Sequence, residues 1–307
     1  MKKRFVYSLA ILVILSSCNS SGEKYTLKPN MKAGESYGLE YKIDFDQDVM
    51  GMQNGMQMTI SYLMKIKNVT AQQDMEMDFM YDRLTMEMKS SALDFSYDSD
   101  STYLPSNGNE EGSDMAQSMR RVYANSMGKM INKPIQVTID AAGQVKEVKG
   151  YQELVKSIQD SIAAEGKQAA NEMMNENQVK QLFQQTFGIF PKKPVAIGEE
   201  WTNQVNMTQS GMVMKYDNTY KLVEILKKEN EAIIDVKGII SLGMTPDKEV
   251  MKIDISGTTK GTMVVDLNTG LIKNGKQNID IKMEMDVNNQ KVPMTMKGTA
   301  LIKGKKL

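Results

Sequence analysis

The chain has 307 residues with 38 basic and 38 acidic side chains, so its formal net charge is zero. This balance argues against a nucleic-acid or other polyanionic partner. The sequence has no histidine and a single cysteine, which excludes Ser-His-Asp triads, Cys-His dyads and histidine-based zinc sites. We therefore expect a protein that is not an enzyme and has no cofactor and no metal centre.

The N-terminus has the features of an export signal followed by a lipid anchor. A short basic start precedes an apolar run from Phe5 to Leu15, which is shorter than the roughly 20 residues of a membrane-spanning helix. Leu15-Ser16-Ser17-Cys18 has the form of a bacterial lipobox, whose cysteine is acylated and becomes the first residue of the mature protein. Because Cys18 is the only cysteine, it has no intrachain disulfide partner. We predict a signal peptide over residues 1–17 and a lipidated tether over 18–24.

The acyl chains predicted on Cys18, such as palmitate, indicate the compartment. One chain holds a protein only marginally, whereas two or three give a durable anchor without a spanning helix. We expect the protein in the cell envelope, lipid-anchored in the outer membrane, with the periplasmic or surface face left open. Removal of the leader leaves 35 of the 38 basic residues against 38 acidic ones, a net charge of −3.

Residues 25–307 are predicted to form a single β-rich domain. In the first β region, residues 25–105, apolar and polar side chains alternate with a period of two, as in half-buried antiparallel strands. The clearest runs are Tyr37, Leu39, Tyr41, Ile43 and Phe45, and then Met56, Met58, Ile60, Tyr62, Met64 and Ile66. After Pro194 the alternation returns in a second β region, residues 195–305.

The period changes in the middle of the chain, over residues 113–190. Apolar residues recur there at helical spacing, as in Met115, Met119 and Val122, in Leu154, Val155 and Ile158, and in Val179, Leu182 and Phe183. A hairpin is expected over Ile135–Val148. The predicted fold is mainly β (α+β), an antiparallel β sandwich or curved half-barrel with a helical insertion near residues 115–187.

Two matches within the chain point to an internal duplication. Gly34-Glu35-Ser36-Tyr37 opens the first β region, and Gly198-Glu199-Glu200-Trp201 opens the second. Two predicted hairpins each pair an aspartate with a turn glycine, Asp140 with Gly143 and Asp266 with Gly270. Because β meanders resemble one another by default, a chance likeness stays open as the alternative.

Three segments and the lipobox together carry a resemblance to known sequences. The segments are Lys32-Ala33-Gly34-Glu35-Ser36-Tyr37, the hairpin Val137-Thr138-Ile139-Asp140 with Gly143, and the run from Phe190 to Trp201, which contains Pro-x-x-Pro-Val-x-x-Gly-Glu-x-Trp. This combination resembles a family of uncharacterised Bacteroidota lipoproteins, over nearly the whole mature chain. The resemblance implies a source and a compartment, and supplies no catalytic or binding residues.

Glu199 and Glu200 beside Trp201 form the pattern closest to enzyme chemistry, because glycosidases act with a pair of carboxylates. Adjacent strand residues face opposite sides, however, so these two carboxylates cannot readily share a substrate. Trp201 is therefore predicted to be a core anchor. A carboxylate-dependent hydrolase stays as a third alternative for function.

Methionine is unusually frequent, with 28 copies, many in Met-x-Met pairs that place both side chains on one face of a strand. Three interpretations are open: a solid core, the lining of a site for an acyl chain or another apolar ligand, and capture of Cu(I) by thioethers, best at Met50–Met58. The candidate lining of the hydrophobic-ligand site comprises Met56, Met58, Met64, Met75, Met77, Met86, Met88, Met283 and Met285.

These features favour a membrane-anchored envelope lipoprotein without enzymatic activity that binds a lipid or another hydrophobic molecule. The alternative is a structural or interaction lipoprotein that presents a β surface to another envelope protein. The predicted partners are thus the membrane, through Cys18, and either a hydrophobic small molecule or an envelope protein.

Overall fold

The computed structural model describes residues 22–91, 93–101, 114–160, 176–209, 212–244, 252–287 and 290–307. The predicted signal peptide and Cys18 lie outside the described residues. None of the helices within these ranges is long and apolar enough to span a membrane.

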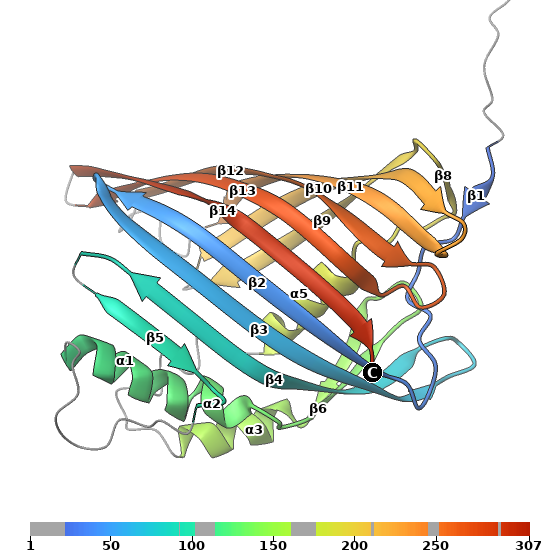
Figure 1. Cartoon of the computed structure of the whole chain (residues 1–307), viewed down its shortest axis with the longest axis horizontal. Helices are drawn as coiled ribbons and strands as arrows, with labels where there is room; N and C mark the ends of the chain where they lie inside the picture. The colour runs from blue at the N-terminus through green and yellow to red at the C-terminus, as the bar shows by residue number, and fades with distance from the viewer. Residues whose placement is uncertain are drawn as a thin grey trace, which may run out of the picture.

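One large antiparallel sheet dominates the fold (Figure 1). Within the described ranges it has twelve strands in the order β7-β6-β4-β3-β2-β14-β13-β12-β11-β10-β9, and β5 pairs with β4. The strands are β2 Ser36–Val49, β3 Met52–Val69, β4 Met75–Lys89, β5 Asp94–Asp98, β6 Ile135–Ile139, β7 Val145–Lys149, β9 Glu200–Gln209, β10 Met212–Leu226, β11 Glu231–Met244, β12 Lys252–Asp266, β13 Ile272–Val287 and β14 Gln290–Lys306. The prediction of a mainly β fold is confirmed.

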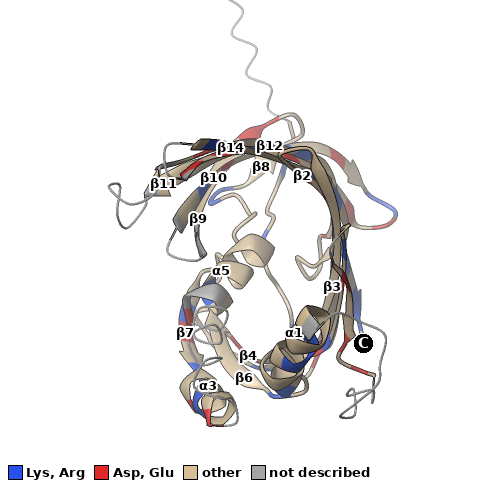
Figure 2. Cartoon of the chain, turned by 90° about the vertical axis from the view of Figure 1, so that its left-hand side faces the viewer, with Lys and Arg blue, Asp and Glu red and all other residues tan. Residues whose placement is uncertain are grey.

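The helices and a small ribbon complete the fold. Within the described ranges the helices are α1 Asp114–Asn125, α2 Met127–Met130, α3 Tyr151–Gln159 and α5 Glu176–Phe187, and the ribbon pairs β1 Lys24–Tyr25 with β8 Val195–Ala196. All four helices fall in the predicted helical middle of the chain, and β6 and β7 form the hairpin predicted there. Figure 2 shows the sheet curving round, with α1 and α5 within the curve. The half-barrel is thus the form of the fold that this chain adopts.

Glycines on the inner face of the sheet allow its strong curvature. A Cβ at Gly261 of β12 would lie 1.9 Å from the carbonyl oxygen of Lys276, and one at Gly298 of β14 would lie 2.1 Å from that of Asp44. Only glycine permits such close approach of neighbouring strands, which is how coiled sheets turn their corners.

The main core lies at one end of the curved sheet, which we call the closed end. There α5 packs between β9 and β7, the two terminal strands of the sheet. Its Phe183 ring contacts the rings of Phe79 and Phe187, with centroids 5.1 and 5.8 Å away. The apolar stripe of α5 therefore closes this end, because it covers the inner face where the terminal strands do not pair.

The two Gly-Glu segments form the same turn. Gly34 and Gly198 have φ angles of 87° and 91°, a conformation that favours glycine. The Gly34 N–H donates to Ile66 O at 2.9 Å, and the Gly198 N–H donates to Leu222 O at 2.7 Å. Glu35 and Glu199, which follow the two glycines, each accept a backbone N–H three residues upstream at 2.8 Å.

The two aspartate turns also match, since Asp140 and Asp266 each accept two backbone N–H groups on one carboxylate oxygen. Each of these turns joins consecutive strands, β6 to β7 and β12 to β13. Equivalent turns in both halves of the chain are what the duplication hypothesis predicts.

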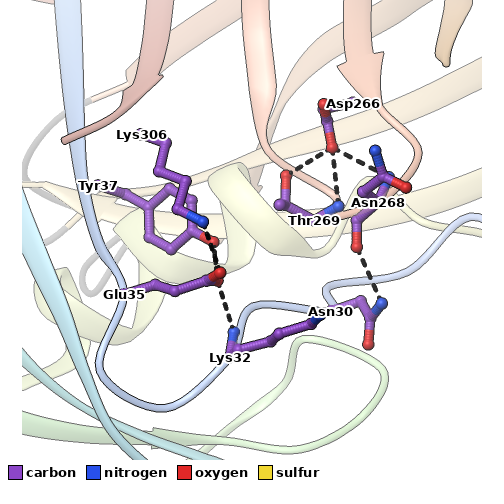
Figure 3. Close-up of polar contacts among 8 residues, drawn as sticks. All are labelled: Asn30, Lys32, Glu35, Tyr37, Asp266, Asn268, Thr269 and Lys306. Atoms are coloured by element: carbon purple, nitrogen blue, oxygen red, sulfur yellow. Dashed lines mark hydrogen bonds and ion pairs between the residues drawn. The ribbon is translucent and has the colours of Figure 1, made fainter.

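Polar contacts tie the N-terminal segment to the closed end (Figure 3). Asn30 donates its backbone N–H to Thr269 O and its side-chain amide to Asn268 O, both at 2.8 Å. Nearby, Glu35 accepts hydrogen bonds from the Lys306 ammonium at 2.6 Å and from the Tyr37 hydroxyl. These bonds join the turn before β2 to the last strand, β14.

Candidate functional site

The two faces of the sheet differ sharply in chemistry. On β13, Ile279, Ile281 and Met283 point to the concave face. The alternating residues Asp280, Lys282 and Glu284 point to the convex face. Strand alternation therefore gives the sheet a charged outer surface and an apolar inner surface.

At the closed end the inner surface is a solid core. Met64, Met75 and Met77 are at most 2% exposed and belong to this core. The hollow beneath α5, lined by residues such as Leu39 and Phe183, has a volume of about 10 Å³. This is about the smallest space that holds one water molecule. These three candidate lining residues are therefore core residues in the conformation described.

A second cluster lies under α1. Met86, Phe95 and Ala116 are buried there, and Met56 and Met88 pack against them. The sequence grouped these three methionines with the ligand lining, and the structure places a helix over them. At the neighbouring β2–β3 turn, Met50 and Met52 are 65% and 59% exposed. The four thioethers considered for Cu(I) are therefore not gathered in one environment.

The inner surface of β10–β14 away from the closed end is only partly covered, and we call it the open face. Ile240, Ile255 and Ile281 are buried at its centre. Around them lie Met214, Tyr216, Leu242, Ile253, Ile279, Met283 and Met296, all partly exposed. This cluster consists of strand residues alone. Met58 and Met285 are also partly exposed on the same side of the sheet. With Met283, and with Met56 and Met88 beside α1, five of the nine candidates keep accessible surface.

The concave face carries almost no charge. Among the described inward positions of β2, β3 and β10–β14, the one charged side chain is Lys306, which pairs with Glu35 at the closed end. The inward polar groups are uncharged: they are tyrosines and, in similar number, amides and a hydroxyl such as Gln47, Asn218 and Thr259. Burial raises the pKa of Tyr41, and it raises that of Tyr81 to about 12. Because the pKa is raised, both phenols stay neutral at physiological pH. Both side chains keep some accessible surface.

Trp201 lies outside the open face. Its ring stacks on Tyr220 with centroids 5.7 Å apart, and its indole N–H donates to Ile189 O at 2.7 Å. Trp201 is thus a core anchor, as the sequence predicted. The Glu199 carboxylate accepts the backbone N–H of Ala196 within its own turn.

A hollow of about 610 Å³ lies elsewhere, near the C-terminus. Its lining includes Glu40, Asp82, Lys273, Lys303 and Lys305. These charged side chains make it unsuited to an apolar ligand.

Within the described ranges, no group of three or more acidic or cysteine side chains is placed to hold a metal ion.

The sequence missed the tyrosines and the polar residues of the inner face. The sequence carries one signal for them, which is their position in the alternating pattern of each strand. That position shows which face of a strand a residue joins, but only the curved sheet shows which residues of distant strands lie opposite one another.

Comparison with solved structures gives matches of low identity. Lipovitellin aligns over 89% of this chain at 11% identity and a TM-score of 0.46, and the chain spans about a quarter (25%) of lipovitellin's length. An outer membrane channel of Pseudomonas putida F1 aligns over 90% of this chain and 97% of its own at 6% identity and a TM-score of 0.24. OpdQ of Pseudomonas aeruginosa aligns over 90% of this chain and all (100%) of its own, at 7% identity and a TM-score of 0.25.

No curated protein matches the sequence. A protein family does match, over residues 72–272, which is more than half of the chain and includes α1, α3, α5 and most of the second β region. The chain therefore belongs to the family of unknown function DUF6263.

Proposed function

We propose that this protein is a lipid-anchored, non-enzymatic envelope protein that binds an apolar molecule, such as an acyl chain, on its open face. The observation that carries the proposal is the open face itself. It is a concave apolar surface around Ile240, Ile255 and Ile281, with partly exposed Met214, Met283 and Met296 at its border. Unbranched thioethers repack around ligands of varied shape at low cost.

The proposed anchor lies at the opposite end from this face. Gly22 lies beside β8, because a Cβ added at Gly22 would lie 3.6 Å from the Cβ of Ala196. Strand β8 belongs to the closed end (Figure 1). Cys18 precedes Gly22 by only four positions. A lipidated Cys18 would therefore hold the closed end near the bilayer and direct the open face away from the attachment point.

A matched pair of variants tests the proposal. Met283 points inward and Lys282, its neighbour, points outward. Met283→Glu places a charge on the open face, and we expect it to weaken binding of a pyrene-labelled hydrocarbon by about tenfold or more, because an unpaired carboxylate would have to be desolvated. Lys282→Glu should bind as the wild type does. Circular dichroism would check that both variants fold.

Two results would contradict this function. One is wild-type protein that neither co-purifies with lipid from detergent-free extracts nor binds the hydrocarbon. The other is equal binding by both variants. A photocrosslinker at position 283 that captures one envelope protein in cells, with no bound lipid, would instead support the alternative of a protein-covered face.

A further inference from the structure

A band of uncharged polar groups lies at the border of the main core, on the concave face of the sheet. On one wall it comprises Tyr41 of β2, Tyr62 of β3 and Tyr81 of β4, all at inward positions. Tyr62 and Tyr81 are paired residues whose ring centroids lie 5.3 Å apart. Tyr41 and Tyr62 also line the small hollow beneath α5. We call these three residues the tyrosine band.

Within the described chain the hydroxyl groups of the tyrosine band donate to no other residue, and Tyr41 and Tyr81 keep accessible surface. Tyr62 is only 6% exposed. Tyr151 of α3 extends the pattern, since its hydroxyl is fully buried and is also without a partner in the described chain. Its pKa is raised by burial first and next by Tyr81, which places it near the band. Buried hydroxyls without partners are unfavourable, so such groups are expected to meet water or a ligand.

The opposite wall presents further polar atoms. Asn218 and Thr259 flank Gly238 in the register of β10, β11 and β12. Their side-chain oxygens lie 2.5 and 2.4 Å from the position that a Cβ of Gly238 would occupy, so both lean over this glycine. The pKa of Tyr220, two residues after Asn218, is raised by burial and then by the phenol of Tyr41. Tyr220 belongs to the main core and Tyr41 packs against the same core, so the two walls face each other across the interior.

None of these groups can neutralise a charge. The described inward cation, Lys306, is paired with Glu35 at the closed end. A carboxylate or phosphate placed at the tyrosine band would lose its water without gaining a counter-ion, which is strongly unfavourable. An uncharged hydroxyl or amide would instead accept and donate hydrogen bonds there, and an ester would accept them.

From this arrangement we infer that the protein selects an uncharged amphiphile, whose acyl chain lies on the open face and whose hydrogen-bonding group meets the tyrosine band. This inference rests on the proposed function and adds the chemical class of the ligand. Glycerol esters and long-chain alcohols or amides fit this class, and free fatty-acid anions do not.

The test compares three probes that share one hydrocarbon tail: monooleoylglycerol, oleate and 8-heptadecene. The protein is the chain from residue 18 onward with Cys18→Ser, which retains every described residue. Displacement of a pyrene-labelled hydrocarbon at pH 8 gives the three affinities. We expect monooleoylglycerol to bind about tenfold or more tightly than oleate, and about fivefold more tightly than 8-heptadecene for each hydrogen bond gained.

Tyr-to-Phe variants identify the residues responsible. The triple variant Tyr41→Phe/Tyr62→Phe/Tyr81→Phe should bind 8-heptadecene unchanged and lose the preference for monooleoylglycerol. Each of the three single variants should lose part of the preference for monooleoylglycerol. The single variants therefore test the inference even if the triple variant does not fold. Tyr25→Phe is the matched control, because the Tyr25 hydroxyl already donates to Glu23 at 2.7 Å.

The outcomes separate the two proposals. If no probe binds the wild type, the proposed function itself fails. If all three bind and oleate is equal to or tighter than monooleoylglycerol, or if the triple and single variants keep the full preference, hydrophobic binding stands and the selection of an uncharged headgroup is overturned.

Discussion

The substitution Glu35→Gln tests the polar contacts that join the turn before β2 to the last strand, β14. The Glu35 carboxylate accepts hydrogen bonds from the Lys306 ammonium at 2.6 Å, from the Tyr37 hydroxyl and from the Lys32 N–H at 2.8 Å (Figure 3). Chiefly through Lys306 and then Tyr37, these contacts lower the Glu35 pKa from 4.5 to about 2. The carboxylate side chain is only 18% exposed, so the interaction is partly sheltered from solvent.

The contribution of Glu35 to stability follows from the difference between its pKa in the folded and the unfolded chain. A folded-state pKa of about 2 against 4.5 in the unfolded chain corresponds to about 3 kcal/mol at neutral pH. The Lys306 side chain is 56% exposed, so solvent screens part of its interaction with Glu35. We therefore expect the carboxylate to contribute about 2 kcal/mol to the unfolding free energy. Because the folded-state pKa is depressed, this stability is present above pH 4.5 and is lost as the pH falls toward 2.

Urea unfolding of wild type and Glu35→Gln at pH 7 and pH 3 measures the effect. The difference in unfolding free energy should be about 2 kcal/mol at pH 7 and less than half of that at pH 3. Glu199→Gln is the control in the equivalent turn, where Lys24 lies 3.9 Å away and the carboxylate side chain is 45% exposed. It should cost less than about 1 kcal/mol. Equal stability of wild type and Glu35→Gln at pH 7, or a difference unchanged at pH 3, would refute the reasoning.

Two further predictions concern the curvature and the anchor. Gly261→Ala should destabilise the fold by about 3 kcal/mol or more in urea unfolding, because its Cβ would meet the Lys276 carbonyl at 1.9 Å. Gly55→Ala, with no atom within 4 Å, should change stability by less than about 1 kcal/mol, and similar values for both would contradict the close-approach argument. Cys18→Ser should move the protein from the membrane to the soluble fraction and abolish labelling by an alkyne fatty acid. Wild-type protein that takes up no label would show that it is not lipidated.

The position of the open face also bears on how a ligand would reach it. Gly22 enters the fold at the closed end, beside β8. A short tether to a membrane would therefore leave the hairpin ends around Met283 and Met296 farthest from the attachment point. In the proposed function, the ligand would thus be received or delivered at the end of the molecule away from its own anchor.

The sequence by itself determined the secondary structure to a large extent. The period-two alternation from Tyr37 to Ile66 and the helical spacing between Met115 and Phe187 are local properties, since each residue's phase decides which face it joins. The turn glycines Gly34 and Gly198 were also recognisable, because the conformation of each turn depends on its own residues.

Only the tertiary structure decided what the methionines do. Met64 and Met283 have the same local pattern, yet Met64 lies in the main core near α5 and Met283 stays partly exposed on the open face. Their difference depends on where distant helices pack and on the order of strands in the sheet, neither of which is encoded in a local period. The tyrosine band has the same origin, because Tyr41 and Tyr220 face each other only after six strands have curved from β2 to β10.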